Sequence, residues 1–264
     1  MESVSGKERG LAISLITFMN VIPGIFFSPI GGWLVEKYGY SSVFLIGSMA
    51  EAFCLFMILL FIKEVRAIRE ETNYRDILSS LLPSNSVLKS LYIVATVDSF
   101  SWGLGSALFY DFLTEWYGYK EHELGILSSI LTASWALFQI PAGKIMDRYG
   151  GRKALMLSEV FGLEGLTLWL LSGDFIVIAF SEVLIGLSPA LWIPAINTYI
   201  TKKTHEERTA SIIGGLTAFR GLSSFPSLYI GGSSCRIVGL HAPLIFNSVG
   251  IIIALIGMMV LLED

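Results

Sequence analysis

The stretch that decides the fold is GKIMDRYGGRK, residues 143–153, which lies between two strongly apolar runs. Four cations, one acid and three glycines stand within these eleven residues. Lys and Arg accumulate in the cytoplasmic loops of membrane proteins, and glycine permits the sharp turns of a short connection. The stretch therefore predicts a tight, charged hairpin between two membrane helices on the cytoplasmic face. The alternative is a simple positively charged topology anchor, which the ordered glycines and the single Asp make less favourable.

The composition also indicates a membrane protein. Of the 264 residues, 53% are hydrophobic and 15% are charged, and the mean hydropathy is +0.67. Soluble domains carry about 25% charged residues, so a soluble protein of this size would lack the polar surface that it needs. Cys54 and Cys235 are isolated and give neither a disulfide framework nor metal-ligand spacing.

Enzyme motifs are absent from the sequence. His122, His205 and His241 fall in different predicted loops, on opposite membrane faces. The sequence contains no H-E-x-x-H, no G-x-S-x-G and no phosphate-binding loop ending in Lys-Ser/Thr. We therefore predict no catalytic residues, no metal site and no cofactor, and any driving force would be an ion gradient.

Eight apolar segments are long enough to span a bilayer, which takes about 20 residues per helix. The predicted fold class is an all-α membrane protein with eight transmembrane helices. A longer polar break, rich in charge, follows the second span; it could form an amphipathic helix at the membrane interface or a solvated linker. The predicted spans are 11–35, 42–62, 90–112, 123–143, 154–172, 175–200, 209–232 and 241–262.

The distribution of Lys and Arg fixes the orientation. With residue 1 inside, fourteen of these cations fall on the inner side and three, Lys37, Lys120 and Arg236, on the outer side. Arg220 is left within a span. The positive-inside rule then predicts that both termini are cytoplasmic.

Residues 143–153 resemble the loop signature of the major facilitator superfamily, G-x-L-x-D-R-x-G-R-[RK], with Ile145 in place of Leu and one extra glycine. Residues 23–32, PGIFFSPIGG, resemble the G-x-x-x-G-P-x-x-G pattern of the fifth helix in drug/proton antiporters, with Ser28 in place of a glycine. The resemblance implies a transporter of two six-helix halves, in which the signature loop lies between the eighth and ninth helices.

The first and seventh predicted spans repeat one another. At an offset of 200, Thr17 aligns with Thr217, Asn20 with Arg220, and residues 31–32 with residues 231–232 as Gly-Gly pairs. By resemblance, residues 1–63 supply the last two helices of the first half, 64–88 a cytoplasmic linker, and 89–264 the complete second half. The family's first four helices have no counterpart here, and we expect a truncated or misassigned gene, or a separately encoded four-helix fragment, rather than a functional eight-helix protein.

Three ionisable residues fall near the membrane midplane, where a charge costs about 2.5–3.5 kcal/mol on insertion scales. They are Asp98, Glu182 and Arg220, and Arg220 lies about 18 Å from the inner edge at 1.5 Å per residue. The resemblance implies that their helices line a central cavity. Polar stripes on these and neighbouring spans must face protein or water, and they add Trp102 and Gln139, while Asn20 is the repeat mate of Arg220. The predicted substrate and proton-coupling residues are Asp98, Glu182, Arg220, Trp102, Gln139 and Asn20.

Two alternatives concern these charges. The buried charges could form a structural ion pair instead of a substrate site. Glu159 is predicted to lie nearer the inner face and to pair with Arg148 or Arg152.

In the signature stretch the family implies that Asp147 accepts hydrogen bonds from a helix N-terminus and that Arg148 and Arg152 close a cytoplasmic gate. The predicted gating residues are Gly143, Asp147, Arg148, Gly150, Arg152 and Lys153.

The resulting hypothesis is a proton-coupled secondary active transporter in the cell membrane, working by alternating access on a small organic solute. Drug efflux is slightly favoured over sugar or organic-acid transport by residues 23–32. The expected partners are the solute and the lipid bilayer, and not nucleic acid. The rival interpretation is a non-transporting membrane protein or an inactive fragment of a split transporter gene.

Overall fold

The computed structural model describes residues 9–61, 85–106, 108–204 and 206–263. All regular secondary structure within these ranges is α-helical, as the sequence predicted. The helices are α1 (Arg9–Tyr38), α2 (Tyr40–Phe61), α4 (Ser86–Ser106), α5 (Phe109–Tyr117), α6 (Glu121–Tyr149), α7 (Gly151–Leu171), α8 (Phe175–Lys203), α9 (Glu206–Val238) and α10 (Ala242–Leu261).

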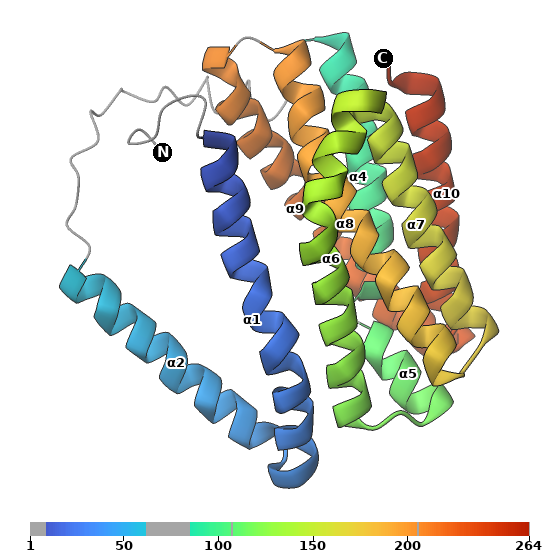
Figure 1. Ribbon diagram of the computed structural model, residues 1–264. Coiled ribbons are helices and arrows are strands. Elements are labelled where there is room, and N and C mark those ends of the chain that lie inside the picture. The colour runs from blue at the N-terminus through green and yellow to red at the C-terminus, as the bar shows by residue number, and fades with distance from the viewer. Residues whose placement is uncertain (1–8, 62–84, 107, 205, 264) are drawn as a thin grey trace.

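Helices α4 and α6–α10 form one bundle of long helices that alternate in direction (Figure 1). Helix α1 packs along α6, on the edge of this bundle. Helix α2 turns back from α1 and leans away from the rest, and its described residues include no buried side chain (Figure 1). The chain therefore consists of a closely packed bundle and a pair of N-terminal helices that reach it through α1.

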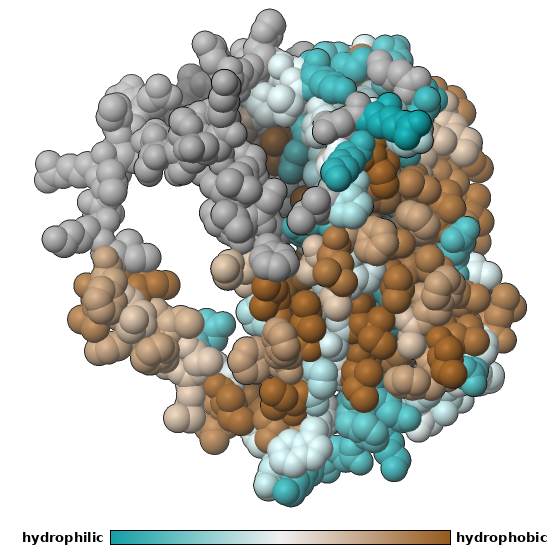
Figure 2. Space-filling model, viewed as in Figure 1, coloured by the Kyte–Doolittle hydropathy of each residue, from teal (hydrophilic) through white to brown (hydrophobic). Residues whose placement is uncertain are grey.

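Four of the described helices, α2, α7, α8 and α10, are long and apolar enough to cross a membrane by length and composition. On the visible face, hydrophobic residues cover the middle and hydrophilic residues gather towards both ends of the bundle (Figure 2). That distribution is the one a bilayer selects, because polar ends remain in water while the middle faces hydrocarbon. The predicted class of all-α membrane protein is confirmed.

Several predicted spans have different bounds in the structure, and two of the differences have a clear physical reading. The span predicted at 90–112 is divided between α4, which ends at Ser106, and the short helix α5, which begins at Phe109. The span predicted at 123–143 continues as α6 to Tyr149, because charged residues at a membrane surface can stay helical while their side chains reach water. The polar break after the second span was predicted to be either an amphipathic helix or a solvated linker. It falls largely on residues 62–84, which lie outside the described part of the chain.

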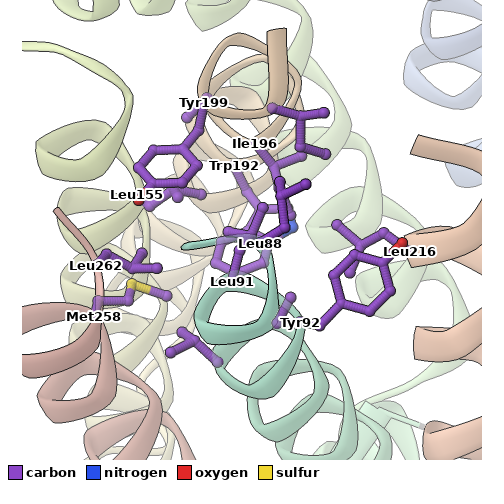
Figure 3. Close-up of a cluster of buried hydrophobic side chains, with 14 of the residues drawn as sticks. Leu88, Leu91, Tyr92, Leu155, Trp192, Ile196, Tyr199, Leu216, Met258 and Leu262 are labelled. Atoms are coloured by element: carbon purple, nitrogen blue, oxygen red, sulfur yellow. The ribbon is translucent and has the colours of Figure 1, made fainter. Parts of the chain in front are cut away.

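The bundle is held by two clusters of buried apolar side chains. The inner cluster joins α4 and α6–α10, and Figure 3 shows Leu91, Leu155, Trp192 and Met258 converging within it. The outer cluster centres on Trp169 and includes Phe112, Leu127, Ile178 and Leu244. On α6 and α7 the residues that line the cavity described below lie between the positions of these two clusters, and on α8 Ile185 and Trp192 belong both to a cluster and to the lining.

Small residues let the helices of the bundle approach closely, as is typical within membranes. A Cβ atom at Gly186 of α8 would collide with the carbonyl oxygen of Leu131 on α6, and one at Gly231 of α9 with that of Leu104 on α4. The turn between α6 and α7 consists of Gly150 alone, at φ +85°. Few residues other than glycine adopt that conformation without strain.

Candidate functional site

A cavity of about 280 Å³ opens between five helices of the bundle. Its lining is largely apolar and aromatic, with a few polar groups among them, which is the usual character of small-molecule sites. Three tryptophans, two carboxyls and one guanidinium contribute to it. The lining residues are Asp98 and Trp102 of α4, Leu131 and Trp135 of α6, Glu159 of α7, Ile185, Ser188, Pro189 and Trp192 of α8, and Arg220 of α9.

An ion pair between α4 and α9 is the central polar contact of this cavity. The Nη2 atom of Arg220 donates to the Oδ2 atom of Asp98 over 3.0 Å. The Asp98 side chain is 2% exposed and that of Arg220 is 28% exposed, so the guanidinium reaches the open space while its partner is buried. The guanidinium carbon also lies 5.2 Å from the ring centre of Trp192, within the range of a cation–π contact.

Glu159 is a third charged residue at the cavity, and its predicted position was wrong. It does not pair with Arg148 or Arg152; it lines the cavity at 1% exposure together with Asp98 and Trp102, and neither of its carboxylate oxygens has a hydrogen-bond partner among the described residues. The helix start at Gly151 explains the difference. Glu159 is more than two turns into α7 and points towards α4, whereas Arg152 is in the first turn.

The predicted substrate residues divide into two groups. Asp98, Trp102 and Arg220 line the cavity together. Glu182 of α8 is completely buried outside that lining, and neither carboxylate oxygen has a hydrogen-bond partner among the described residues. Gln139 of α6 is half-buried and Asn20 of α1 is exposed, and both also lie outside the lining.

The signature stretch lies mostly at two helix ends. Gly143 to Tyr149 are the last residues of α6, and Arg152 and Lys153 begin α7. The guanidinium of Arg152 donates from Nη2 to the carbonyl oxygen of Met259 over 2.7 Å and from Nε to that of Met258 over 3.3 Å. These carbonyls belong to the last turn of α10, where the helix dipole favours a cation.

The other predicted gating residues make fewer defined contacts. The Arg148 guanidinium carbon lies 5.2 Å from the ring centre of Tyr149, and both residues are exposed. Lys153 is also exposed. The side chain of Asp147 lies outside the described part of the structure, so the interaction predicted for it stays a prediction.

Within the described residues, no group of three or more His, Cys, Asp or Glu side chains is placed to hold a metal ion. The side chains that line the cavity offer recognition by charge, hydrogen bonding and aromatic contact. Sequence reasoning found Asp98, Trp102 and Arg220 through their depth and helical spacing. It missed Trp192 as a neighbour of the ion pair, because an apolar residue in a membrane helix carries no signal that separates a cavity wall from a packed core.

The family model of the Major Facilitator Superfamily matches residues 91–264, about two thirds of the chain. The chain is also 29% identical over 111 residues to the voltage-gated purine nucleotide uniporter of Homo sapiens, which covers 39% of this chain and 26% of that protein. It is 28% identical over 155 residues to probable anion transporter 7 of Oryza sativa subsp. japonica, which covers 55% of this chain and 35% of that protein. The chain thus matches about a quarter to a third of the length of these relatives.

Proposed function

Because the chain belongs to the Major Facilitator Superfamily, we propose that it works as a secondary active transporter of a small organic solute, coupled to a proton gradient. The solute would cross by alternating access, in which two halves rock about a central site. The proposal places the protein in the cell membrane with both termini in the cytoplasm, on the strength of the Lys and Arg distribution.

In this proposal residues 1–63 supply two helices of the first half, 64–88 the linker and 89–264 the second half. The contact between α1 and α6 is then a contact between halves, and the cavity belongs to the second half. The gating role of Gly143, Asp147, Arg148, Gly150, Arg152 and Lys153 is part of the same proposal. The bond from Arg152 to the end of α10 would fix the inner ends of α7 and α10 together, so that they move as one body.

The observation that carries the proposal is the partly buried ion pair on the wall of an open cavity, in which Asp98 is buried and the guanidinium of Arg220 reaches the open space. A buried ion pair is a weak contributor to stability, because the cost of desolvating both charges offsets their attraction. Apolar residues of similar volume would hold the helices at least as well. The pair is therefore better explained by a role in binding solute or proton than by packing alone.

The solute class is a further part of the proposal. The names of the human and rice relatives refer to purine nucleotides and to anions, and Arg220 offers the cation that an anionic group needs. The resemblance of residues 23–32 to drug/proton antiporters favours instead a lipophilic drug. The first probes are therefore ATP as an organic anion and a lipophilic organic cation as the drug, each tested with and without a pH gradient.

Substitution of Arg220 tests the proposal in membrane vesicles from cells that express the protein from its intact locus. We expect Arg220→Ala to abolish gradient-driven uptake while leaving the amount of inserted protein unchanged. Arg220→Lys should also fail, because an ammonium lacks the planar fork that meets a carboxylate. Arg236→Ala, on the exposed outer end of the same helix, is the matched control and should transport normally.

A structural role gives the opposite pattern. If the pair only holds α4 and α9 together, Arg220→Ala should lower the amount of folded protein, because it leaves Asp98 buried without its cation. The double variant Asp98→Asn with Arg220→Ala would then restore folding and uptake together. Restored uptake in that double variant would overturn the proposed function.

A further inference from the structure

The charged groups that face the cavity do not balance. Asp98 and Glu159 are 2% and 1% exposed, and the guanidinium of Arg220 is the only cation in the lining. The lining residues from α6 and α8 are uncharged, and α10 contributes none. Glu182, the other buried acid of α8, lies outside the lining. With both carboxyls ionised the site would hold one uncompensated negative charge in a buried place, which is costly.

The hydrogen bonds show where this charge would lie. Oδ2 of Asp98 accepts from Arg220, whereas Oδ1 of Asp98 and both carboxylate oxygens of Glu159 have no hydrogen-bond partner among the described residues. Both carboxyls line the same small cavity. Two ionised carboxylates cannot hydrogen-bond, because both only accept. A single proton on either one supplies the missing donor and removes the excess charge.

We infer that Asp98 and Glu159 hold one proton between them and form the proton-binding site of the cavity. This inference rests on the proposed proton coupling and names the groups that would perform it. With the proton bound, the two carboxyls and Arg220 are neutral as a set. Once the proton leaves, the set is negative and the second carboxylate competes for the guanidinium.

The same geometry links proton binding to solute binding. Protonation of the pair lowers the negative charge that faces Arg220, so the guanidinium becomes available to an anionic group in the cavity. Loss of the proton restores the full attraction of Asp98 for Arg220 and weakens the hold on such a group. Proton and anion would therefore bind together and leave together, which is the linkage that a coupled carrier requires.

Trp102 lines the same cavity as the two carboxyls. Its indole packs onto α7 at Gly162, three residues beyond Glu159. A Cβ atom at Gly162 would lie 2.7 Å from Cζ2 of that indole, so glycine at this position leaves room for the indole at the cavity wall.

Infrared spectroscopy tests the inference on the full chain in lipid nanodiscs, without a transport assay. Difference spectra between acid and alkaline buffer report protonated carboxyl groups through their C=O stretch. We expect a band that titrates in the wild type and is lost in Glu159→Gln. Asp98→Asn should move its midpoint to lower pH, because Glu159 then faces Arg220 without a neighbouring anion. Glu164→Gln, the same change on an exposed position of α7, is the matched control and should leave this band intact.

Two results would overturn the inference: survival of the band in Glu159→Gln, or a band that Glu159→Gln removes but Asp98→Asn does not alter. If Glu159→Gln does not fold, Glu159→Asp decides the matter, because it keeps the carboxyl and should keep a titrating band whose midpoint differs from that of the wild type, whereas an unchanged band would count against the inference. Absence of uptake by the wild type would defeat the proposed function and leave the infrared result standing. Uptake that stays proton-coupled in Glu159→Gln would defeat the shared proton and leave the function standing.

Discussion

The two most extensive helix contacts in the molecule, α7 with α8 and α1 with α6, are built in different ways. Helices α7 and α8 bury large apolar side chains, with Trp169 and Ile178 in the outer cluster. Helix α1 has Val21 as the only buried residue among its described side chains. An interface of interlocked apolar side chains separates only with the loss of many contacts, whereas one of small residues can separate or slide with less rearrangement.

The contact between α1 and α6 depends on close backbone approach. Gly32 of α1 lies against the carbonyl oxygen of Glu121, and Gly125 of α6 lies against that of Ser28. The hydroxyl of Ser129 donates to the carbonyl oxygen of Ile25 over 2.6 Å. These contacts join two helices that the proposed function assigns to opposite halves. The difference between the two interfaces agrees with that assignment, because the α7–α8 contact would stay fixed within one half while the α1–α6 contact would change as the halves move.

The largest expected effect on stability comes from replacing a tryptophan by alanine, and the replacement should act differently in the bundle and on α1. Trp169→Ala removes a side chain that is 1% exposed and should destabilise the folded protein by about 3–5 kcal/mol, as large core truncations do. Its indole nitrogen has no hydrogen-bond partner among the described residues, so the loss is one of packing. Trp33→Ala on α1, where the side chain is 50% exposed, should cost less than about 1 kcal/mol. Unfolding in mixed micelles with increasing SDS measures both.

Equal destabilisation by Trp169→Ala and Trp33→Ala would contradict the comparison, because α1 would then belong to the same cooperative core as α7. Leu171→Ala provides an internal control on α7, since that side chain is 76% exposed. It should behave as Trp33→Ala does. The control separates burial from the identity of the helix.

A smaller effect is expected where an added methyl group meets backbone. Gly186→Ala in the bundle and Gly32→Ala on α1 each place a Cβ atom against a carbonyl oxygen of α6. Overpacking of this kind costs about 1–3 kcal/mol. We expect Gly186→Ala to lower the stability of the whole bundle, and Gly32→Ala to shift α1 away from α6 while the bundle stays folded. Gly31→Ala, with open space at its Cβ position, should have neither effect.

A cysteine crosslink measures the position of α1 in these variants. The hydroxyl oxygens of Ser28 and Ser128 are 3.3 Å apart across the contact, so cysteines at both positions should form a disulfide under mild oxidation after Cys54 and Cys235 are replaced by Ser. Gly32→Ala should lower the crosslink yield and Gly31→Ala should not. An unchanged crosslink yield in Gly32→Ala would show that α6 moves to make room for the methyl group and that α1 and α6 do not approach each other tightly.

Hydropathy, spacing and the charge distribution predicted the helical class and the approximate positions of most of the long helices, because burial in a bilayer imposes one simple rule on about twenty residues at a time. The end of α6 could not be placed from that rule: Lys144 and Arg148 suggested a loop, yet they are helical up to Gly150. The break between α4 and α5 also lies within an apolar run that hydropathy treats as continuous.

The candidate site was predicted in part for a related reason. Depth along a helix placed Asp98 and Arg220 near the midplane, and the structure joins them over 3.0 Å. Depth does not specify rotation about the helix axis. Glu159 was therefore assigned to the inner face although it points to α4, and Glu182 was assigned to the cavity although it lies outside the lining. Which face of a helix meets which neighbour is decided by tertiary packing, as at Gly162 under the Trp102 indole.

The smallest expected effect lies at the end of the α1–α6 contact, where Nδ1 of His122 and Oε2 of Glu36 are 2.6 Å apart. Both side chains are about two fifths exposed, and the contact is an ion pair only when the imidazole carries its second proton, in which case such exposed pairs contribute about 0.2–1 kcal/mol. Glu36→Gln and His122→Gln should each lower the crosslink yield between positions 28 and 128 only slightly. A double-mutant cycle on that yield isolates the pair, because the double variant should lose no more than either single variant. High salt should weaken the wild-type contact to the same extent. A loss in the double variant equal to the sum of the single losses would mean that the two side chains do not act as a pair. The glycine and serine contacts would then hold α1 to α6 without help from charge.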